Sequence, residues 1–342
     1  MDFIRDDSVT AWVLEHPAHL QLLAGFIREG TQDDMYILTR RKECLAMFAE
    51  STGHLPVRQV VEVERPFGPG IGRLMTLRLA MTRRRKVIAA LRDRTANGVA
   101  IERLIGMGTS IELMAAKRAG VAQRWYISDT EVSHLAHRLA LRHATDVVLP
   151  TYWRADLDGG FLDSLASSDI RVHRHGRLHA EFRHEIEARD SKNSVLVRRL
   201  EGGGSHDGPE IISLDGVLSE VDHEMDFADE NGEISNRWEL PRRLASYAGV
   251  ITQSTTLAVE AASTNVPTLL VSAAERGFID HARRRGMPLI QSRFPQGHGR
   301  ELERWKTLVR RRDSIVRPQI WENEGLPACV ETLQVRKESA RC

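Results

Sequence analysis

The residues best suited to chemistry lie in Thr252-Gln-Ser-Thr-Thr256, with Glu260 on the helix that this run enters. A strand that leads into a helix leaves free backbone N–H groups and the positive end of the helix dipole at such a turn, and both attract anions. The hydroxyl groups add donors for phosphate oxygens, and a carboxylate one turn later suits the two hydroxyls of a ribose. The plain alternative is an ordinary N-cap at Ser254 or Thr255 with a solvated Glu260.

Histidines follow the first predicted strand, in Glu15-His-Pro-Ala-His19. The dipole at a helix N-terminus disfavours the charged imidazolium, so a histidine there tends to stay neutral. A neutral imidazole can take a proton from a hydroxyl, which makes His19 a candidate general base. A capping or packed histidine is the alternative.

Two further turns at predicted strand ends carry small or polar residues. Gly106-Met-Gly-Thr-Ser110 permits close backbone approach to a ligand. Ser128-Asp-Thr-Glu131 offers Asp129 as a base or as a group that orients a substrate hydroxyl. An N-cap role for Asp129 or Thr130 is the alternative.

Arg198 and Arg199 end a predicted strand of the second half. One of them would point toward the Thr252 turn, where a guanidinium could neutralise a diphosphate. An exposed arginine pair is the alternative.

These turns belong to a regular alternation of strands and helices, which predicts parallel sheets with helices on both faces. The stretch 151–190 is expected to carry the chain between two domains, and no element is recognisable in 201–238. The predicted strands are 10–14, 35–39, 57–63, 99–105, 124–128, 146–149, 194–200, 249–251, 268–271 and 288–291. The predicted helices are 18–28, 40–49, 73–92, 111–119, 131–143, 241–248, 256–262, 278–285 and 300–312.

Length and composition fit two globular domains: 342 residues, 42% hydrophobic and 28% charged. The 48 basic and 47 acidic residues nearly balance, which argues against a nucleic-acid-binding protein. Three cysteines are too few for a disulfide framework or a zinc cluster, and the histidines between 173 and 184 lack ligand spacing. Neither a signal peptide nor an apolar run of about 20 residues is present, so a cytoplasmic location is expected.

The predicted helix 73–92 is rich in arginine and carries an apolar stripe. A basic amphipathic helix can lie on anionic lipid, which would place the protein peripherally at the inner membrane face. The alternative is a helix that crosses between strands and has a wet, charged face.

The order of these motifs resembles the largely archaeal family named domain of unknown function 354. The resemblance spans roughly residues 10 to 295. The segment Gln253 to Pro267 is also similar to the donor-binding segment of MurG-type glycosyltransferases and of UDP-N-acetylglucosamine 2-epimerases. The matching motifs are His16-Pro-Ala-His-Leu20, Tyr36-Ile-Leu-Thr-Arg40, Gly108-Thr-Ser110, Ser128-Asp-Thr-Glu131, Ala144-Thr-Asp-Val-Val-Leu-Pro150, His175-Gly176, Leu196-Val-Arg198 and Ser254 to Pro267.

The resemblance implies a GT-B architecture: two Rossmann-like doubly wound domains that face a central cleft. Residues 1–180 would form the acceptor side and residues 181–342 the side that holds the nucleotide-sugar donor. A UDP-sugar is the favoured donor, and an inverting transfer to an unknown glycan or lipid-linked acceptor would need no metal or other cofactor.

The same resemblance implies roles for single residues. His19 and Asp129 would act in catalysis, with His19 as the base. Glu260 would bind the ribose, and the diphosphate would lie at Arg198, Gln253, Ser254, Thr255 and Thr256. The acceptor side would supply contacts from His16, Gly108, Thr109, Ser110, Glu131 and Gly176.

Two other functions fit the same scaffold. An NDP-sugar 2-epimerase would need acid and base groups on both sides of the anomeric carbon. A binding protein without catalysis is suggested by Gln253-Ser-Thr255, because the related families usually have glycine in this turn.

Overall fold

The computed structural model folds into two compact units, residues 1–182 with 324–342 and residues 183–323. Among the described residues, no helix is long and apolar enough to cross a membrane. The structure describes residues 8–16, 19, 23, 27, 30–39, 59–65, 72–176, 192–200, 212–228, 240–293, 299–312 and 330–333.

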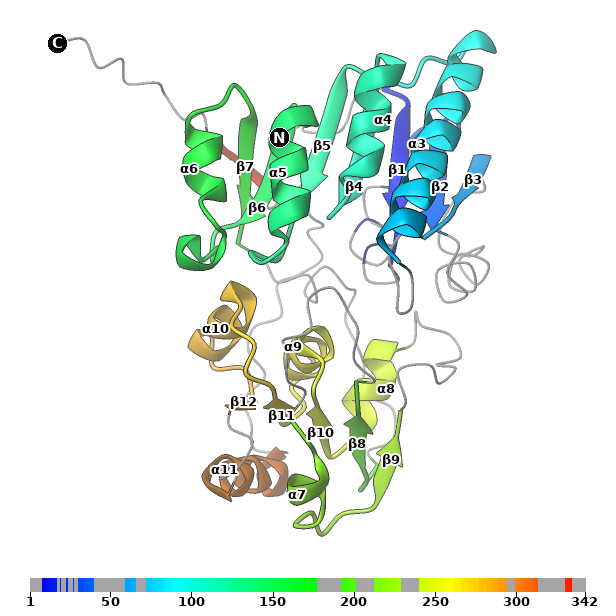
Figure 1. Ribbon diagram of the computed structural model, residues 1–342. Coiled ribbons are helices and arrows are strands. Elements are labelled where there is room, and N and C mark those ends of the chain that lie inside the picture. Colours follow the sequence, from blue (N-terminus) through cyan, green and yellow to red (C-terminus); the bar gives the residue numbers. More distant parts are fainter. Residues whose placement is uncertain are drawn as a thin grey trace, which may run out of the picture. The chain divides into compact units, whose positions relative to one another are not determined.

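An eight-stranded sheet forms the centre of the first unit, in the order β13-β7-β6-β5-β4-β1-β2-β3 (Figure 1). All neighbouring strands are parallel except β13, which pairs antiparallel with β7. The chain starts in the middle, winds outward to β3 and returns to β4 on the other side of β1, as in dinucleotide-binding folds. The strands are β1 (Thr10–Leu14), β2 (Met35–Thr39), β3 (Gln59–Val63), β4 (Arg103–Met107), β5 (Gln123–Ile127), β6 (Asp146–Pro150), β7 (Arg171–His175) and β13 (Val330–Leu333).

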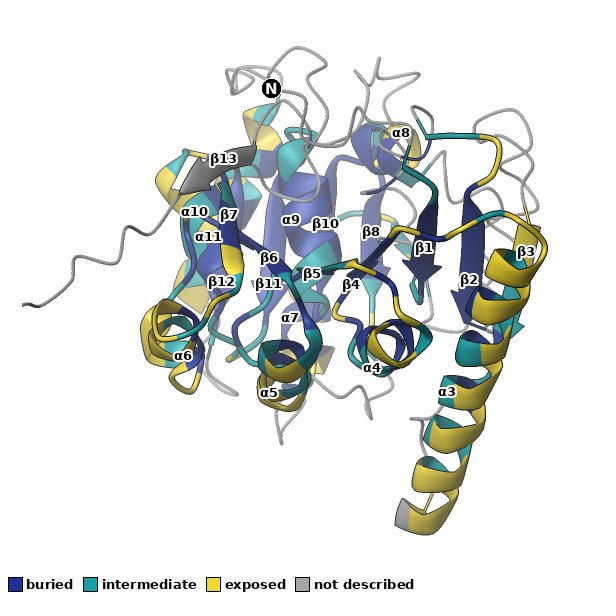
Figure 2. Ribbon diagram, turned by 90° about the horizontal axis from the view of Figure 1, so that it is seen from above, coloured by how far each residue is buried: buried dark blue, intermediate teal, exposed yellow. Residues whose placement is uncertain are grey.

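Helices α3, α4, α5 and α6 lie on one face of this sheet (Figures 1 and 2). Strands β1, β2, β4 and β6 are buried along their whole length, since their side chains are covered on both faces of the sheet. Figure 2 shows α3 as exposed along most of its length. The helices are α3 (Arg73–Ala96), α4 (Ile111–Ala119), α5 (His134–His143), the short 3₁₀ helix η2 (Ala155–Leu157) and α6 (Phe161–Ala166).

Two expectations for the first unit are wrong. The stretch 151–190 is not only a link, because α6 and β7 extend the sheet beyond β6. The C-terminal segment does not stay with the second unit, because β13 pairs with β7 of the first. The predicted helix 40–49 lies outside the described residues, whereas His19, Leu23 and Ile27 are helical as expected.

The second unit has a five-stranded parallel sheet in the order β12-β11-β10-β8-β9. Strand β9 lies in the acidic stretch where the sequence predicts no strand. It has three residues and is the outermost strand on one side of the sheet. The strands are β8 (Val195–Arg198), β9 (Met225–Phe227), β10 (Gly249–Thr252), β11 (Thr268–Val271) and β12 (Leu289–Ser292). The helices are α7 (Asp215–Leu218), α8 (Leu240–Ser246), α9 (Thr255–Ser263), α10 (Gly277–Arg284) and α11 (Gly299–Arg310).

Both sheets have a point where the winding direction reverses. In the first unit it lies between β1 and β4, and in the second between β8 and β10. Ligands of open parallel sheets bind beyond the carboxyl ends of the strands at such points. The end of each sheet at which its parallel strands have their carboxyl ends is called its ligand edge. The fold therefore directs attention to the residues that follow these four strands.

Candidate functional site

In the second unit, β10 ends at Thr252 and α9 begins three residues later, at Thr255. The Ser254 hydroxyl accepts the Leu257 N–H at 3.3 Å, so Ser254 is the N-cap of α9. The Thr252 hydroxyl accepts the Ser254 N–H at 3.0 Å. Thr255 and Thr256 occupy the first turn, where the helix offers its own N–H groups no acceptor. This turn can receive an anion on backbone N–H groups and two threonine hydroxyls.

Gln253 has a different role from the one that the sequence predicts. Its amide oxygen accepts the Leu200 N–H at 2.7 Å, and its amide nitrogen donates to the Ile212 carbonyl at 2.6 Å. Both ends of the buried amide are thus used to join the exit of β8 to the segment at Ile212. The side chain stabilises the loops around the turn and is not available to a phosphate group.

Glu260 lies on α9 with only 5% of its surface exposed. The alternative of a solvated helix residue is therefore wrong. Its carboxylate is held inside the unit, on the helix that leaves the Thr252 turn.

Arg198 is the strand partner of Thr252 across the point where the winding reverses. Its carbonyl accepts the Gln253 N–H at 3.3 Å, which ties the exits of β8 and β10 together. Neighbouring strand residues point to opposite faces. The Arg199 guanidinium accordingly forms an ion pair with Asp215 at 3.2 Å. Of the two arginines, Arg198 is the one beside the Thr252 turn.

The loop after β11, a part of the same sheet edge, is not predicted as a site. The Gln291 amide nitrogen, from β12, donates to the Ser272 and Ala274 carbonyls at 2.8 and 2.9 Å. Arg293 adds an ion pair with Glu275 at 2.7 Å. These contacts hold the loop in place ahead of α10.

In the first unit, the turn after β1 carries Glu15, His16 and His19. The His19 N–H donates to the His16 carbonyl at 2.9 Å, and the two ring centroids lie 5.9 Å apart. The structure brings the two histidines together at the point where the winding of the first sheet reverses. The sequence predicts both histidines as residues of the acceptor side.

In the turn after β4, the Thr109 side chain packs closely against Gly106. A Cβ atom at Gly106 would lie 2.6 Å from the Thr109 hydroxyl oxygen, so only glycine lets the turn fold back this tightly. Thr109 is buried, and the Gly108 N–H donates to the Ile127 carbonyl at 2.8 Å. Thr109 is therefore a packing residue, whereas half-buried Ser110 remains accessible at the start of α4.

In the turn after β5, some predicted site residues are buried and others stay partly accessible. Glu131 is fully buried and accepts the Arg154 N–H at 3.1 Å, so it anchors the loop after β6. Ser128 lies 3.3 Å from the His137 ring nitrogen Nε2, inside the unit. Asp129 is half-buried and follows the carboxyl end of β5. Gly176, after β7, is exposed and lies 3.8 Å, measured from its ideal Cβ position, from the Thr151 hydroxyl.

A charge cluster of Glu15, Arg83 and Glu112 lies beside these turns and is missed from sequence. The Arg83 guanidinium forms ion pairs with both carboxylates and donates to the Glu64 carbonyl at 3.2 Å. Arg83 and Glu112 are each 1% exposed, and the Glu15 side chain is 30% exposed. Arg83 shares its helix face with the buried residues Val87 and Leu91, four and eight positions later. This spacing could have shown that Arg83 does not belong to the wet face of its helix.

Electrostatics in the cluster favour an uptake of a proton by Glu15. Burial raises the pKa of Glu15 to about 7, and the Glu112 charge adds to the rise, although Arg83 opposes it. Burial also lowers the pKa of Arg83, but the two carboxylates outweigh this and hold the guanidinium charged. Burial raises the pKa of the nearby Tyr126 hydroxyl, and the charges of Asp129 and Glu15 raise it further.

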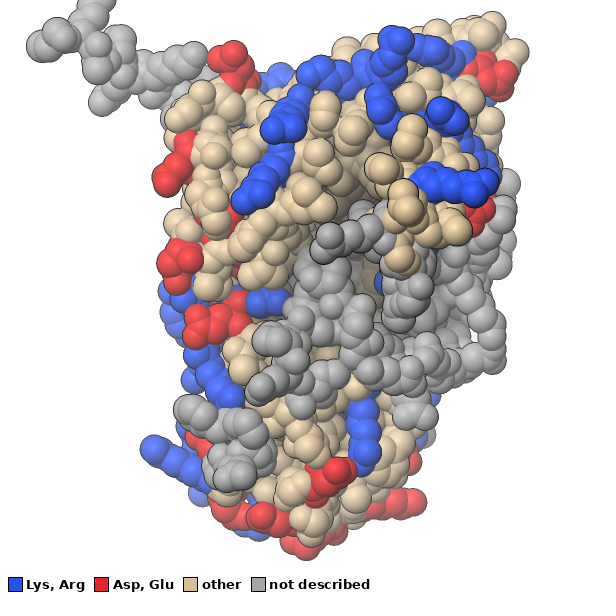
Figure 3. Space-filling model, viewed as in Figure 1, with Lys and Arg blue, Asp and Glu red and all other residues tan. Residues whose placement is uncertain are grey.

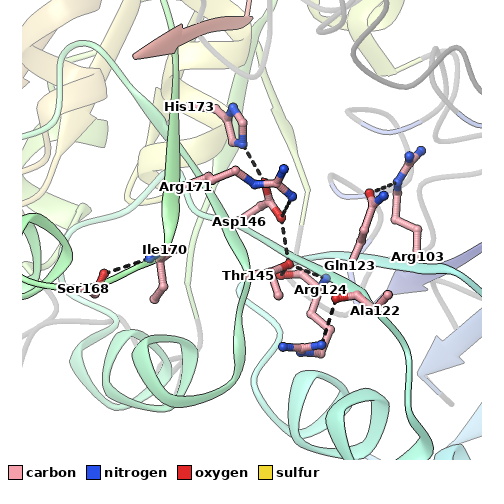
Figure 4. Close-up of polar contacts among 10 residues, drawn as sticks. All are labelled: Arg103, Ala122, Gln123, Arg124, Thr145, Asp146, Ser168, Ile170, Arg171 and His173. Carbon is pink, nitrogen blue, oxygen red and sulfur yellow. Dashed lines mark hydrogen bonds and ion pairs between the residues drawn. The ribbon is translucent and has the colours of Figure 1, made fainter. Parts of the chain in front are cut away.

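A second polar network lies on β6 and β7, away from the ligand edge of the first sheet (Figure 4). Asp146 is buried and accepts from His173 at 2.9 Å, Arg171 at 2.8 Å and Thr145 at 2.7 Å. Burial raises the pKa of Asp146, but these three hydrogen bonds outweigh it and the pKa is lowered. The His173 ring stacks on Trp125 at 4.7 Å. Because Asp146 and Arg171 are the first residues of β6 and β7, the network lies toward the amino ends of the strands, where it stabilises the sheet away from the carboxyl ends that bind ligands.

No group of three histidine, cysteine, aspartate or glutamate residues within the described ranges could hold a metal ion. His173 and His175 lie on β7, where the first of them is held by Asp146. His179 and His184 lie outside the described residues.

No protein-family model matches the sequence, and no curated protein matches it. Solved structures do match. Over 90% of this chain, a UDP-GlcNAc 2-epimerase from Neisseria meningitidis bound to UDP-GlcNAc matches across 95% of its own length, with 11% identity and a TM-score of 0.56. MnaA of S. aureus, in a structure with UDP, matches at 11% identity over 88% of both chains, with a TM-score of 0.55. A UDP-glucosyltransferase from Polygonum tinctorium matches at 13% identity over 90% of this chain and 94% of its own, with a TM-score of 0.51.

These likenesses show the fold. The chain has a GT-B fold with two parallel-sheet α/β units, as the sequence predicts. The narrower resemblance to the family named domain of unknown function 354 stays a prediction.

Proposed function

We propose that the second unit binds the nucleotide of an activated sugar at the Thr252 turn, and that the protein transfers this sugar to a hydroxyl acceptor. The observation that carries the proposal is the first turn of α9, where Thr255 and Thr256 sit one turn before the buried carboxylate of Glu260. UDP and UDP-GlcNAc in the similar structures named above support the choice of a UDP-sugar.

The chemistry follows from the parts of the turn. The diphosphate would receive hydrogen bonds from the N–H groups and hydroxyls of Thr255 and Thr256, with Ser254 as the cap behind them. Arg198 would neutralise part of its charge, and Glu260 would accept hydrogen bonds from the ribose. The helix dipole and the guanidinium can stabilise a leaving diphosphate without a metal ion. Inversion then needs only a base on the acceptor.

The first unit would supply the acceptor side. His16, His19, Ser110, Asp129 and Gly176 all lie at its ligand edge, after β1, β4, β5 and β7. Thr109 and Glu131 would act indirectly, because both are buried and shape their turns. His19, which the resemblance implies as the base, and Asp129, which follows the end of β5, remain the catalytic candidates.

We also propose that the start of α3 contacts an anionic membrane surface. At the start of α3, Leu74 is 86% exposed, and Leu77 and Met81 are also exposed. Figure 3 shows Lys and Arg side chains gathered over the end of the first unit that carries α3 and α4. Co-sedimentation of the protein with anionic vesicles, lost in Leu74→Gln with Leu77→Gln, would support it. Equal sedimentation of both proteins would rule out this surface.

The binding step is tested by thermal unfolding with UDP. UDP should raise the melting temperature of the wild-type protein, because a ligand that binds only the folded state stabilises it. The shift should disappear in Glu260→Ala and persist in Glu220→Gln, an exposed carboxylate of the same unit. The absence of a shift with UDP and other common nucleotides would disprove the proposal.

Epimerisation is a second candidate, favoured by the epimerases among the similar structures. Incubation with UDP-GlcNAc in the absence of an acceptor separates the two reactions, because only an epimerase would form an isomer of the nucleotide-sugar. A binding protein without catalysis would show the UDP shift but neither reaction.

A further inference from the structure

The charge cluster of Glu15, Arg83 and Glu112 contains a group that the proposed function does not use. Glu15 is the first residue after β1, at the point where the winding of the sheet reverses and open sheets bind ligands. Unlike its two partners, which are buried, Glu15 keeps 30% of its side chain accessible. The cluster therefore connects the interior of the first unit to its ligand edge.

Arg83 holds one oxygen of Glu15 in a fixed place. Its Nη2 atom pairs with Oε1 of Glu15, its Nε atom with Glu112, and its Nη1 atom donates to the Glu64 carbonyl at 3.2 Å. Oε2 of Glu15 accepts no hydrogen bond from any part of the chain that the structure describes. A carboxylate that is oriented by a second group and keeps one oxygen available has the arrangement of a general base.

The charges around Glu15 also suit proton transfer. Two carboxylates share one buried guanidinium, so the cluster carries an excess negative charge that a proton removes. The groups that face Glu15 are Arg83 of α3, Glu112 of α4, Arg65 after β3 and Tyr126 of β5. Burial raises the pKa of Glu15 to about 7, and a base works best when its pKa lies near the working pH.

We propose that Glu15 is the general base of the sugar transfer. In this step Oε2 takes the proton of the acceptor hydroxyl while the hydroxyl oxygen bonds to the anomeric carbon. The bond between that carbon and the diphosphate oxygen breaks, and its electron pair leaves with the nucleoside diphosphate. The inference rests on the proposed function, and it gives Glu15 the role that the sequence resemblance gives to His19.

The experiment uses water as the acceptor, so that no other substrate has to be known. The release of UDP from UDP-GlcNAc is measured from pH 5 to 9, and UDP binding is measured separately by calorimetry. The proteins are wild type, Glu15→Gln, Glu112→Gln and the control Glu102→Gln, an exposed carboxylate just before β4 at the opposite edge of the sheet. Circular dichroism checks that each variant is folded.

The wild-type rate should rise with pH through about 7, because the base must be ionised. Glu15→Gln should lower the rate about 100-fold or more and abolish the rise, with the UDP affinity within twofold of wild type. Glu112→Gln should move the rise to lower pH, since it removes a negative charge beside Glu15. Glu102→Gln should behave as wild type.

The results separate the two proposals. A Glu15→Gln protein that binds UDP and keeps the rate with its rise would overturn the role of Glu15 alone. A wild-type protein that does not bind UDP would overturn the proposed function, and with it this role. A wild-type protein that binds UDP but releases none from UDP-GlcNAc would overturn the transfer and its base while the binding site stands.

Discussion

The ligand edges of the two units differ in where their charges lie. After β10 of the second unit, the half-buried side chains of Ser254, Thr255 and Thr256 carry neutral hydroxyls, and the carboxylate of Glu260 is buried further along the helix. After β1 of the first unit, Glu15, Arg83 and Glu112 pack against one another. We infer that backbone geometry sets the second site, whereas buried charge supports the first. Substitution of Arg83 should therefore affect folding before binding, and the reverse should hold for Thr255 and Thr256.

The largest effect is expected for Arg83→Met. This substitution leaves two carboxylates in the interior without their cation, which typically costs about 3–5 kcal/mol of unfolding free energy. Denaturant unfolding measures the loss. Arg85→Met, on the exposed face of the same helix, should change stability by less than about 0.5 kcal/mol. If the two variants were equally stable, the cluster would not support the first unit.

The next largest effect is a pH dependence that belongs to Glu15. Its pKa is raised from 4.5 to about 7 on folding, so the folded protein keeps a proton that the unfolded chain loses between these values. The stabilisation is complete below pH 4.5 and is lost as the pH rises to about 7. At about 1.4 kcal/mol per pH unit the loss is at most about 3 kcal/mol, and partial exposure of the side chain reduces it.

The measurement is the difference in unfolding free energy between wild type and Glu15→Gln across this pH range. As the pH falls from about 7 to 4.5, the wild type should become more stable relative to Glu15→Gln. If the two plots of unfolding free energy against pH were parallel, the pKa of Glu15 would not be raised on folding. Buried charge at the first ligand edge would then not distinguish it from the second.

Much of the fold could be predicted from sequence because its elements are short buried runs bounded by glycine, proline or polar turns. β1, β2, α4 and β11 begin and end where the sequence predicts. β9 and β13 could not be predicted, because edge strands of three or four residues carry too little pattern and depend on their partners.

The site could be predicted only as far as its position. Local sequence places polar turns at the strand ends, but it does not show which side chains turn inward. Gln253, Thr109 and Glu131 are polar residues in such turns, and each is buried and used within its unit. The partners of Arg83 lie 29 and 68 positions away in the chain, so only the tertiary structure brings this cluster together.

A smaller effect on stability is expected at Gln253 in the second unit. Gln253→Ala removes both hydrogen bonds of the amide and leaves the Leu200 N–H and the Ile212 carbonyl without it. Such a loss typically costs about 1–3 kcal/mol. Thermal unfolding should show the loss, whereas UDP affinity, measured below the melting temperature, should fall less than in Thr256→Ala. The opposite order would mean that the amide contacts the ligand directly.

The smallest effect is expected for Ser254→Ala, which tests whether the hydroxyls of the second site serve the fold or the ligand. Ser254 caps α9 through the Leu257 N–H, and the loss of such a cap costs about 1 kcal/mol. Thr255→Ala and Thr256→Ala remove hydroxyls that make no cap, so they should leave stability within about 0.5 kcal/mol of wild type and weaken UDP binding. Calorimetry and denaturant unfolding on the three variants separate the two losses. If Ser254→Ala weakened UDP binding as much as the threonine variants did, the cap itself would contact the phosphate. The second edge would then resemble the first, where one side chain supports both fold and chemistry.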